Sequence, residues 1–138
     1  MKRLTIRWMV LGLGLVILAG CAGSVSAQQM APPPAFKKVS TLVPLPDYIP
    51  GLGTLYVDPK TLPAGPFLAY NKQGKLVSSV YMIPIKEIDA HKKFEDLGVA
   101  NGMAPQRVEL YYNAGHPGVP EPHYHVILWY VGEDEEPK

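Results

Sequence analysis

Cysteine is almost absent from this 138-residue sequence, which contains a single one, Cys21. A chain with one cysteine forms no internal disulfide. Downstream of position 21 it also offers no thiolate metal site and no cysteine nucleophile. The stability of the folded part must therefore come from core packing alone.

The sequence also lacks an excess of either charge. Its formal net charge is +1, and residues 21–138 carry ten Lys and Arg against twelve Asp and Glu. A nucleic-acid-binding surface needs a basic patch or stripe, and none stands out here. We therefore expect no nucleic-acid partner.

An apolar run covers Trp8 to Leu18, but its eleven residues fall short of the roughly 20 that cross a bilayer as a helix. Three cations precede it, Lys2, Arg3 and Arg7. A positive segment followed by a short apolar one is typical of an export signal. We therefore assign residues 1–20 to a signal peptide.

Leu18-Ala19-Gly20-Cys21 resembles the lipobox of bacterial lipoproteins. This resemblance implies cleavage before Cys21 and attachment of diacylglycerol to its sulfur, which would anchor the protein to the cell envelope. Because Ala22 is not the aspartate associated with inner-membrane retention, the expected location is the outer membrane, facing the periplasm. A competing interpretation is ordinary cleavage after Val25-Ser26-Ala27.

Composition divides the rest of the chain into a tether, one domain and a tail. Residues 21–46 include three consecutive prolines and predict a stiff, extended tether. Residues 47–132 are long enough for a single domain. Residues 133–138 are mostly acidic and predict a frayed, solubilising tail.

Short segments with alternating or continuous apolar residues predict strands at 53–58, 66–70, 76–83, 106–112 and 123–131. Asn71 to Lys75 has the composition of a hairpin loop, in which Gly74 takes a positive φ. The last strand is apolar on both faces, which is typical of a central or covered strand.

Between the third and fourth of these strands, the spacing predicts a helix over residues 85–97. Pro84 suits its first turn and Gly98 its C-terminal end. Its apolar stripe is formed by Ile85, Ile88, Phe94 and Leu97. His91 lies on the stripe, where a partly buried histidine bonded to a neighbour is the favoured interpretation. The order predicts an α+β fold, an antiparallel sheet of four to five strands with one helix packed on a face.

A Gly/Pro-rich loop from Ala114 to Pro122 leads into the last strand, which opens with His123-Tyr124-His125. Side chains two apart on a strand share a face, so His123 and His125 point the same way. Glu121 falls on that face if the extended geometry reaches back to it, and His116 lies in the loop. Imidazole suits zinc and copper. The sequence therefore predicts a divalent-metal site, copper or zinc, at His116, Glu121, His123 and His125.

Other interpretations of the same residues stay open. A His-x-His pair at a strand end also simply caps an apolar run with groups that tolerate water. A second hypothesis is a non-catalytic scaffold that pairs with a partner or with copies of itself through its aromatic sheet. That sheet contains Tyr111, Tyr112, Tyr124, Trp129 and Tyr130.

A third hypothesis, a small hydrolase or lyase, would use Glu121 or a metal-bound water as its base. No Gly-x-Ser-x-Gly motif supports a serine nucleophile. We therefore favour a lipid-anchored binding protein over an enzyme.

Tyr111-Tyr112-Asn113, followed by Gly115 to Gly118 and by Val119 to Tyr124, resembles a small bacterial exported-protein family of unknown function. Its members carry a Gly-His-x-Pro loop before a Pro-His-aromatic strand. The resemblance implies an α+β, oligomeric protein and carries over His116 and His123. The family strand continues aspartate-x-histidine, where this sequence has His125 and Ile127.

Overall fold

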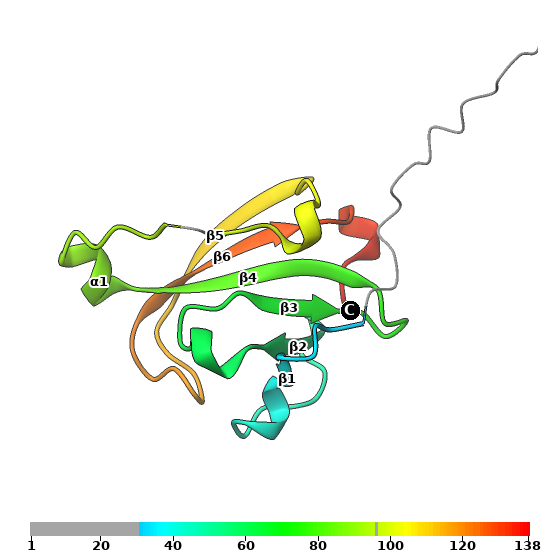
Figure 1. The fold of residues 1–138 in the computed structure, drawn as a ribbon, viewed down its shortest axis with the longest axis horizontal. Helices are drawn as coiled ribbons and strands as arrows, with labels where there is room; N and C mark the ends of the chain where they lie inside the picture. The colour runs from blue at the N-terminus through cyan, green and yellow to red at the C-terminus, as the bar shows by residue number, and fades with distance from the viewer. Residues whose placement is uncertain (1–30, 96) are drawn as a thin grey trace, which may run out of the picture.

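A computed structural model of the chain describes residues 31–95 and 97–138. Six antiparallel strands form one sheet in the order β1-β2-β3-β4-β6-β5 (Figure 1). The strands are β1 (Lys37–Lys38), β2 (Thr54–Val57), β3 (Phe67–Tyr70), β4 (Leu76–Pro84), β5 (Arg107–Asn113) and β6 (His123–Trp129). The one α-helix of the described part is α1 (Ile85–Asp89). The antiparallel sheet with a single helix is confirmed, but the sheet has one strand more than the upper number predicted.

The hairpin between β3 and β4 is confirmed. The side-chain oxygen Oδ1 of Asn71 accepts hydrogen bonds from the backbone N–H groups of Gln73 and Lys75, at 3.0 and 2.9 Å. Gly74 has a φ of +74°, a conformation that glycine adopts at no steric cost. Local turn chemistry therefore sets this connection.

The side of the sheet that carries the site is covered by loops rather than by a helix. Its apolar core is closed by side chains of residues 39–52 and of the loop before β6. The covering residues are Val39, Val43, Leu45, Ile49, Leu52 and Val119. All nine residues of β4 are buried, because both of its faces are covered.

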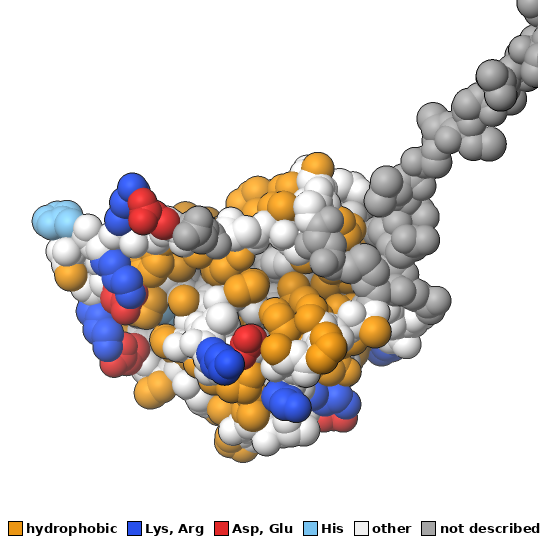
Figure 2. Space-filling model, viewed as in Figure 1, with side chains coloured by type: hydrophobic (Ala, Val, Ile, Leu, Met, Phe, Trp, Pro, Cys, Tyr) orange, Lys and Arg blue, Asp and Glu red, His pale blue; other side chains and the backbone are white. Residues whose placement is uncertain are grey.

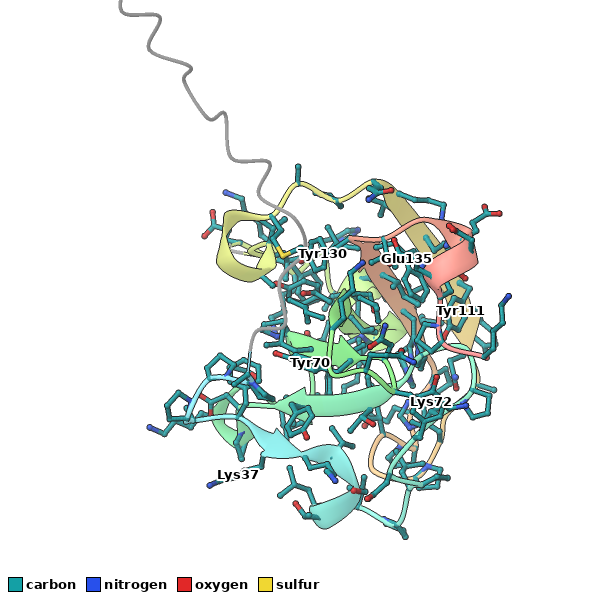
Figure 3. All side chains as sticks on the ribbon, turned by 90° about the vertical axis from the view of Figure 1, so that its right-hand side faces the viewer. Lys37, Tyr70, Lys72, Tyr111, Tyr130 and Glu135 are labelled. Carbon is teal, nitrogen blue, oxygen red and sulfur yellow. The ribbon has the colours of Figure 1, made fainter. Side chains whose placement is uncertain are left out.

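The opposite side of the sheet is covered by residues 98–103. Tyr81 donates its hydroxyl hydrogen to the carbonyl of Gly98 at 2.5 Å, and the Tyr130 hydroxyl accepts from the Ala100 N–H at 2.9 Å. Figure 3 shows Tyr70 and Tyr130 on this side of the sheet, away from Tyr111. Strand β6 lies between β4 and β5; its residues on the site side are buried, and those on this opposite side are half-buried.

The predicted helix over 85–97 is wrong beyond Asp89. His91 takes a φ of +54°, and its N–H donates to Ile88 while the N–H of Lys92 donates to the carbonyl of Glu87. This pair of bonds is a Schellman motif, which ends a helix. His91 therefore has the helix-terminating role that the sequence predicted for Gly98. Ile88 and Leu97 are 44% and 42% exposed, and the helix therefore covers no face of the sheet.

Two predicted boundaries also differ from the structure. Lys37 and Lys38, assigned to the tether, pair with β2, and the next residue, Val39, is buried in the core. The acidic tail is not frayed, because the carbonyl of Pro137 accepts from Gly51 at 2.9 Å and the carboxylate of Glu135 pairs with Lys75. Both ends of the described chain thus belong to the folded domain.

Residues 1–30, which include the predicted signal peptide and Cys21, lie outside the described part. Within the described part, no helix is both long and apolar enough to span a membrane. Figure 2 shows charged side chains of both signs next to one another, with exposed apolar side chains between them.

Candidate metal centre

A tight turn holds the first histidine. The backbone N–H of His116 donates to the carbonyl of Val119, and the N–H of Val119 donates back to that of His116, both at 3.0 Å. Pro117 and Gly118 are the two central residues, and Gly118 has a φ of +90°. Proline followed by a glycine with positive φ is the pattern of a type II turn. A Cβ at Gly118 would lie 2.8 Å from Val43, so the turn packs directly on residues 39–52.

Strand β6 supplies the other two histidines. His123 lies opposite Asn113 and Pro84, and His125 lies opposite Tyr111 and Met82. The two imidazoles point to the same side of the sheet, as predicted, and on that covered side their exposed fractions are 0% and 3%. Their strand is anchored on both sides, so the backbone positions of this pair are well fixed.

The three histidines form one cluster. Each contributes a ring nitrogen, and the three nitrogens lie within 4.8 Å of one another. The ring centroid of His116 lies 5.0 Å from that of His123 and 5.6 Å from that of His125. His116 is half-buried, so the cluster is fully covered on the sheet side and less covered on the loop side.

Hydrogen bonds from Nδ1 place the lone pair on Nε2 in two of the rings. His123 Nδ1–H donates to the Glu121 carbonyl at 2.6 Å, and His116 Nδ1–H donates to the Pro117 carbonyl at 3.0 Å. A carbonyl oxygen only accepts, so in both neutral rings the hydrogen sits on Nδ1 and Nε2 carries a lone pair. Metal-bound histidines in proteins are oriented in the same way.

The third ring is tied to Tyr111 and to His123. His125 Nδ1 lies 2.8 Å from the Tyr111 hydroxyl, and His125 Nε2 lies 2.9 Å from His123 Nε2. Because His123 Nε2 has no hydrogen in the neutral state, His125 must donate from Nε2, and Tyr111 then donates to His125 Nδ1. A metal ion at His125 Nε2 would require this hydrogen to move to Nδ1 of the same ring, and Tyr111 would turn its hydroxyl to accept from Nδ1.

Burial keeps His125 neutral. The pKa of His125 is lowered to about 4, first by burial and then by the neighbouring His123 and His116. A neutral imidazole is the form that binds metal, and near neutral pH no proton has to leave this ring.

The other predicted site residues lie elsewhere. The carboxylate of Glu121 is exposed and pairs with Lys86 at 2.6 Å, so it does not belong to the cluster of three histidines. Its contribution is the backbone carbonyl that holds His123. His91 is exposed at the end of α1, and the interpretation of it as a partly buried residue is wrong.

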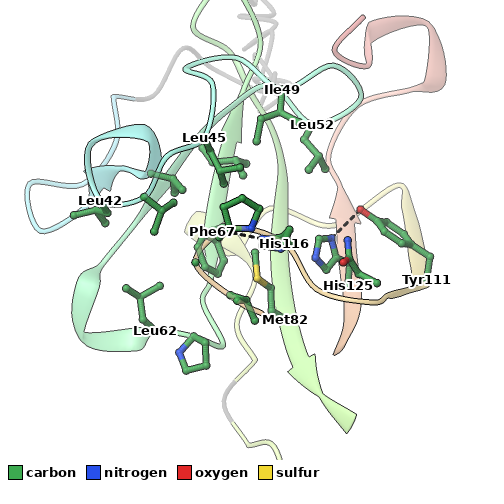
Figure 4. Close-up of a pocket in the computed structure, with 18 residues that line it drawn as sticks. Leu42, Leu45, Ile49, Leu52, Leu62, Phe67, Met82, Tyr111, His116 and His125 are labelled. Atoms are coloured by element: carbon green, nitrogen blue, oxygen red, sulfur yellow. Dashed lines mark hydrogen bonds between the residues drawn. The ribbon is translucent and has the colours of Figure 1, made fainter. Parts of the chain in front are cut away.

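The cluster opens into an apolar pocket of about 260 Å³ (Figure 4). His116 and His125 line it together with Tyr111 and Asn113, and its other walls come from residues 39–67, Met82 and residues 117–119. Sequence spacing missed Met82 and Tyr111, because only the strand register places them beside His125. In Figure 4, Leu42 and Leu62 lie at one end of the pocket and His125 with Tyr111 at the other.

The cluster fits a tetrahedral ion after a small adjustment. Zinc–nitrogen bonds are about 2.0–2.1 Å long, so two nitrogens on one ion lie roughly 3.3 Å apart. His123 and His125 are already 2.9 Å apart at Nε2. The ring nitrogen of His116, which lies within 4.8 Å of the other two, would have to move closer to them to reach this spacing.

Comparison with known proteins finds a similar solved structure. No protein-family model and no curated protein matches the chain. A crystal structure of the hypothetical protein TTHB210 from Thermus thermophilus matches at 49% identity and a TM-score of 0.59. The match covers 66% of this chain and 88% of the Thermus protein. The chain belongs to the family of this Thermus protein. This structural similarity supports the fold described above, and the relative's name states no activity.

Because His125 has a lowered pKa, the metal-free protein should lose stability in acid. The unfolded chain binds a proton near pH 6.5 and the folded one near pH 4, so stability falls as the pH drops through this window. Between pH 7 and 5 the wild type should lose about 1–2 kcal/mol through this residue. Urea denaturation of wild type and His125→Gln, with chelator present, measures the difference.

The matched control is His91→Gln, which removes an exposed histidine outside the cluster and should leave the wild-type pH dependence intact. Identical pH dependence in the wild type and in His125→Gln would contradict the argument.

Proposed function

We propose that this protein binds one divalent metal ion, zinc or copper, through His116, His123 and His125. The observation that carries the proposal is the shared orientation of the rings. The Nδ1 atoms of His116 and His123 are held by carbonyl oxygens and that of His125 by a hydroxyl, and the ring nitrogens gather within 4.8 Å. Three histidines that leave a fourth position open are typical of zinc sites that take a further ligand.

The choice between the two metals depends on Met82. This residue pairs with His125 across β4 and β6 and lines the same pocket. A thioether is a soft ligand that occurs as an axial ligand in copper sites, whereas zinc has no need of it. Met82→Leu should therefore weaken Cu(II) binding and leave zinc binding unchanged if the sulfur is a ligand.

We also propose that the domain acts in the cell envelope, attached through a lipid on Cys21. The lipobox-like sequence and the preceding export signal support this, and they lie outside the described residues. Labelled palmitate should be incorporated into the wild type and not into Cys21→Ala. The variant should leave the membrane fraction, and its retention there with no loss of label would contradict the anchor.

Zinc titration of the folded protein tests the metal site. Wild type should take up one zinc ion per chain, measured by calorimetry and by elemental analysis after gel filtration. The double variant His123→Gln/His125→Gln should lose this uptake, because two of the three nitrogens are removed. Circular dichroism checks that the variant is folded.

Two control variants sharpen this test. His91→Ala and Glu121→Gln change exposed side chains outside the cluster and should keep one zinc per chain. Uptake that persists in the double variant, or that is lost in His91→Ala, would contradict the assignment.

A second candidate function, a self-associating scaffold, is favoured by strand β5. Its Val108, Leu110 and Tyr112 are 57%, 65% and 54% exposed, and the strand forms an edge of the sheet. Exposed apolar residues on an edge strand suit pairing with a second copy of the chain. Figure 2 shows apolar side chains exposed over this part of the sheet.

If β5 pairs with a second copy, wild type should form a concentration-dependent oligomer in sedimentation velocity. Leu110→Lys should shift it to the monomer, because a buried lysine would lack a partner. Lys93→Leu changes an exposed residue away from β5 and should not alter the assembly. A monomeric wild type at high concentration would overturn this candidate.

A further inference from the structure

We infer that the pocket beside the histidines takes a monocarboxylate of about eight carbons with an apolar tail. Its carboxylate would lie toward His116 and His125, and its tail along the wall formed by residues 39–62. This inference rests on the proposed metal site, because the ion supplies the charge that selects an anion.

The charge balance of the cluster calls for an anionic ligand. Three neutral imidazoles leave a divalent ion with its full charge, and no carboxylate belongs to the cluster in the described part of the chain. The nearby carboxylates already have ion-pair or hydrogen-bond partners. Glu121 pairs with Lys86, and Glu109 accepts from Trp129 Nε1 at 2.8 Å and from Arg107 at 2.8 Å. An uncompensated double charge next to apolar walls is costly, so the open position favours an anion.

The polar groups at this end of the pocket suit a carboxylate. Asn113 lines the pocket and uses its Oδ1 atom to accept the Gly115 N–H at 2.8 Å, which leaves its amide N–H groups as donors. A carboxylate has two oxygens, so one can face the ion and the other a donor of this kind. His123 does not line the pocket, so of the three histidines a ligand in the pocket would contact only His116 and His125.

The rest of the pocket suits a hydrocarbon tail. Its walls include Leu45, Ile49, Leu52 and Phe67, and its far end is formed by Leu42 and Leu62 (Figure 4). These last two side chains are 42% and 45% exposed, so that end opens to solvent. An apolar cavity of roughly 150 Å³ holds benzene. In proportion, the 260 Å³ here holds roughly ten carbons, enough for an eight-carbon acid.

Calorimetric titration of the zinc-loaded full domain with butanoate, hexanoate and octanoate tests the inference. Affinity should rise about fourfold for each added methylene, because each one is buried against the pocket wall. Octanoate should bind at least tenfold more tightly than 1-octanol, which has the same number of carbons and no charge. It should also bind at least tenfold more tightly to the zinc-loaded than to the metal-free protein.

A variant pair separates the pocket from the general surface. Leu62→Asp places a negative charge at the pocket end and should weaken octanoate at least tenfold while leaving one zinc per chain. Leu97→Asp changes an equally exposed leucine outside the pocket and should bind octanoate like the wild type.

The outcomes distinguish the two proposals. Failure of the wild type to take up one zinc overturns the metal site and this inference with it. Normal zinc uptake with equal affinities for the three acids, or with octanol as good as octanoate, overturns only the ligand. Octanoate binding that is the same without zinc also overturns the ligand's placement on the ion.

Discussion

The structure depends on the pairing of β6 with β4 on one side and β5 on the other. This double pairing fixes which face each residue of β6 presents, since a shift by one residue would exchange the two faces. It turns His123 and His125 into the covered side with Ile127 and Trp129. The same register brings Met82 and Tyr111 beside His125, so the cluster and the pocket wall follow from one set of backbone hydrogen bonds.

Buried imidazoles are tolerated here because their nitrogens have hydrogen-bond partners. The two buried rings share one hydrogen between them, and their outer nitrogens bind the Glu121 carbonyl and the Tyr111 hydroxyl. An unpaired polar group at this depth would destabilise the fold by about 1–3 kcal/mol. The cluster is therefore stable as a neutral hydrogen-bonded chain, and it has the lone pairs that a cation needs.

Local patterns predicted five of the six strands, the β3–β4 hairpin and the common face of His123 and His125. The errors arose where distant segments decide the structure. Helix α1 stops at Asp89 because residues 90–92 adopt a Schellman motif around a non-glycine residue, for which the sequence has no strong signal. Residues 39–52 look like a linker when the sequence is read alone. Several of their apolar side chains are buried or half-buried because they cover an apolar face of the sheet that would otherwise be exposed. The carboxylate of Glu121 pairs with Lys86 and does not join the histidines as predicted, because the residues before β6 do not continue its strand geometry.

The two ends of the described chain lie together, and the histidine loop lies far from both. Ala31 and Pro32 border the same surface hollow as Asn71 and Lys72, and the carbonyl of Lys138 accepts from Lys72. His123 pairs with Pro84, the last residue of β4. Pro84 lies at the other end of β4 from the β3–β4 hairpin that contains Asn71 and Lys72 (Figure 1), roughly 25 Å away along the strand. An anchor attached upstream of residue 31 would thus hold the domain at the end opposite the histidine loop.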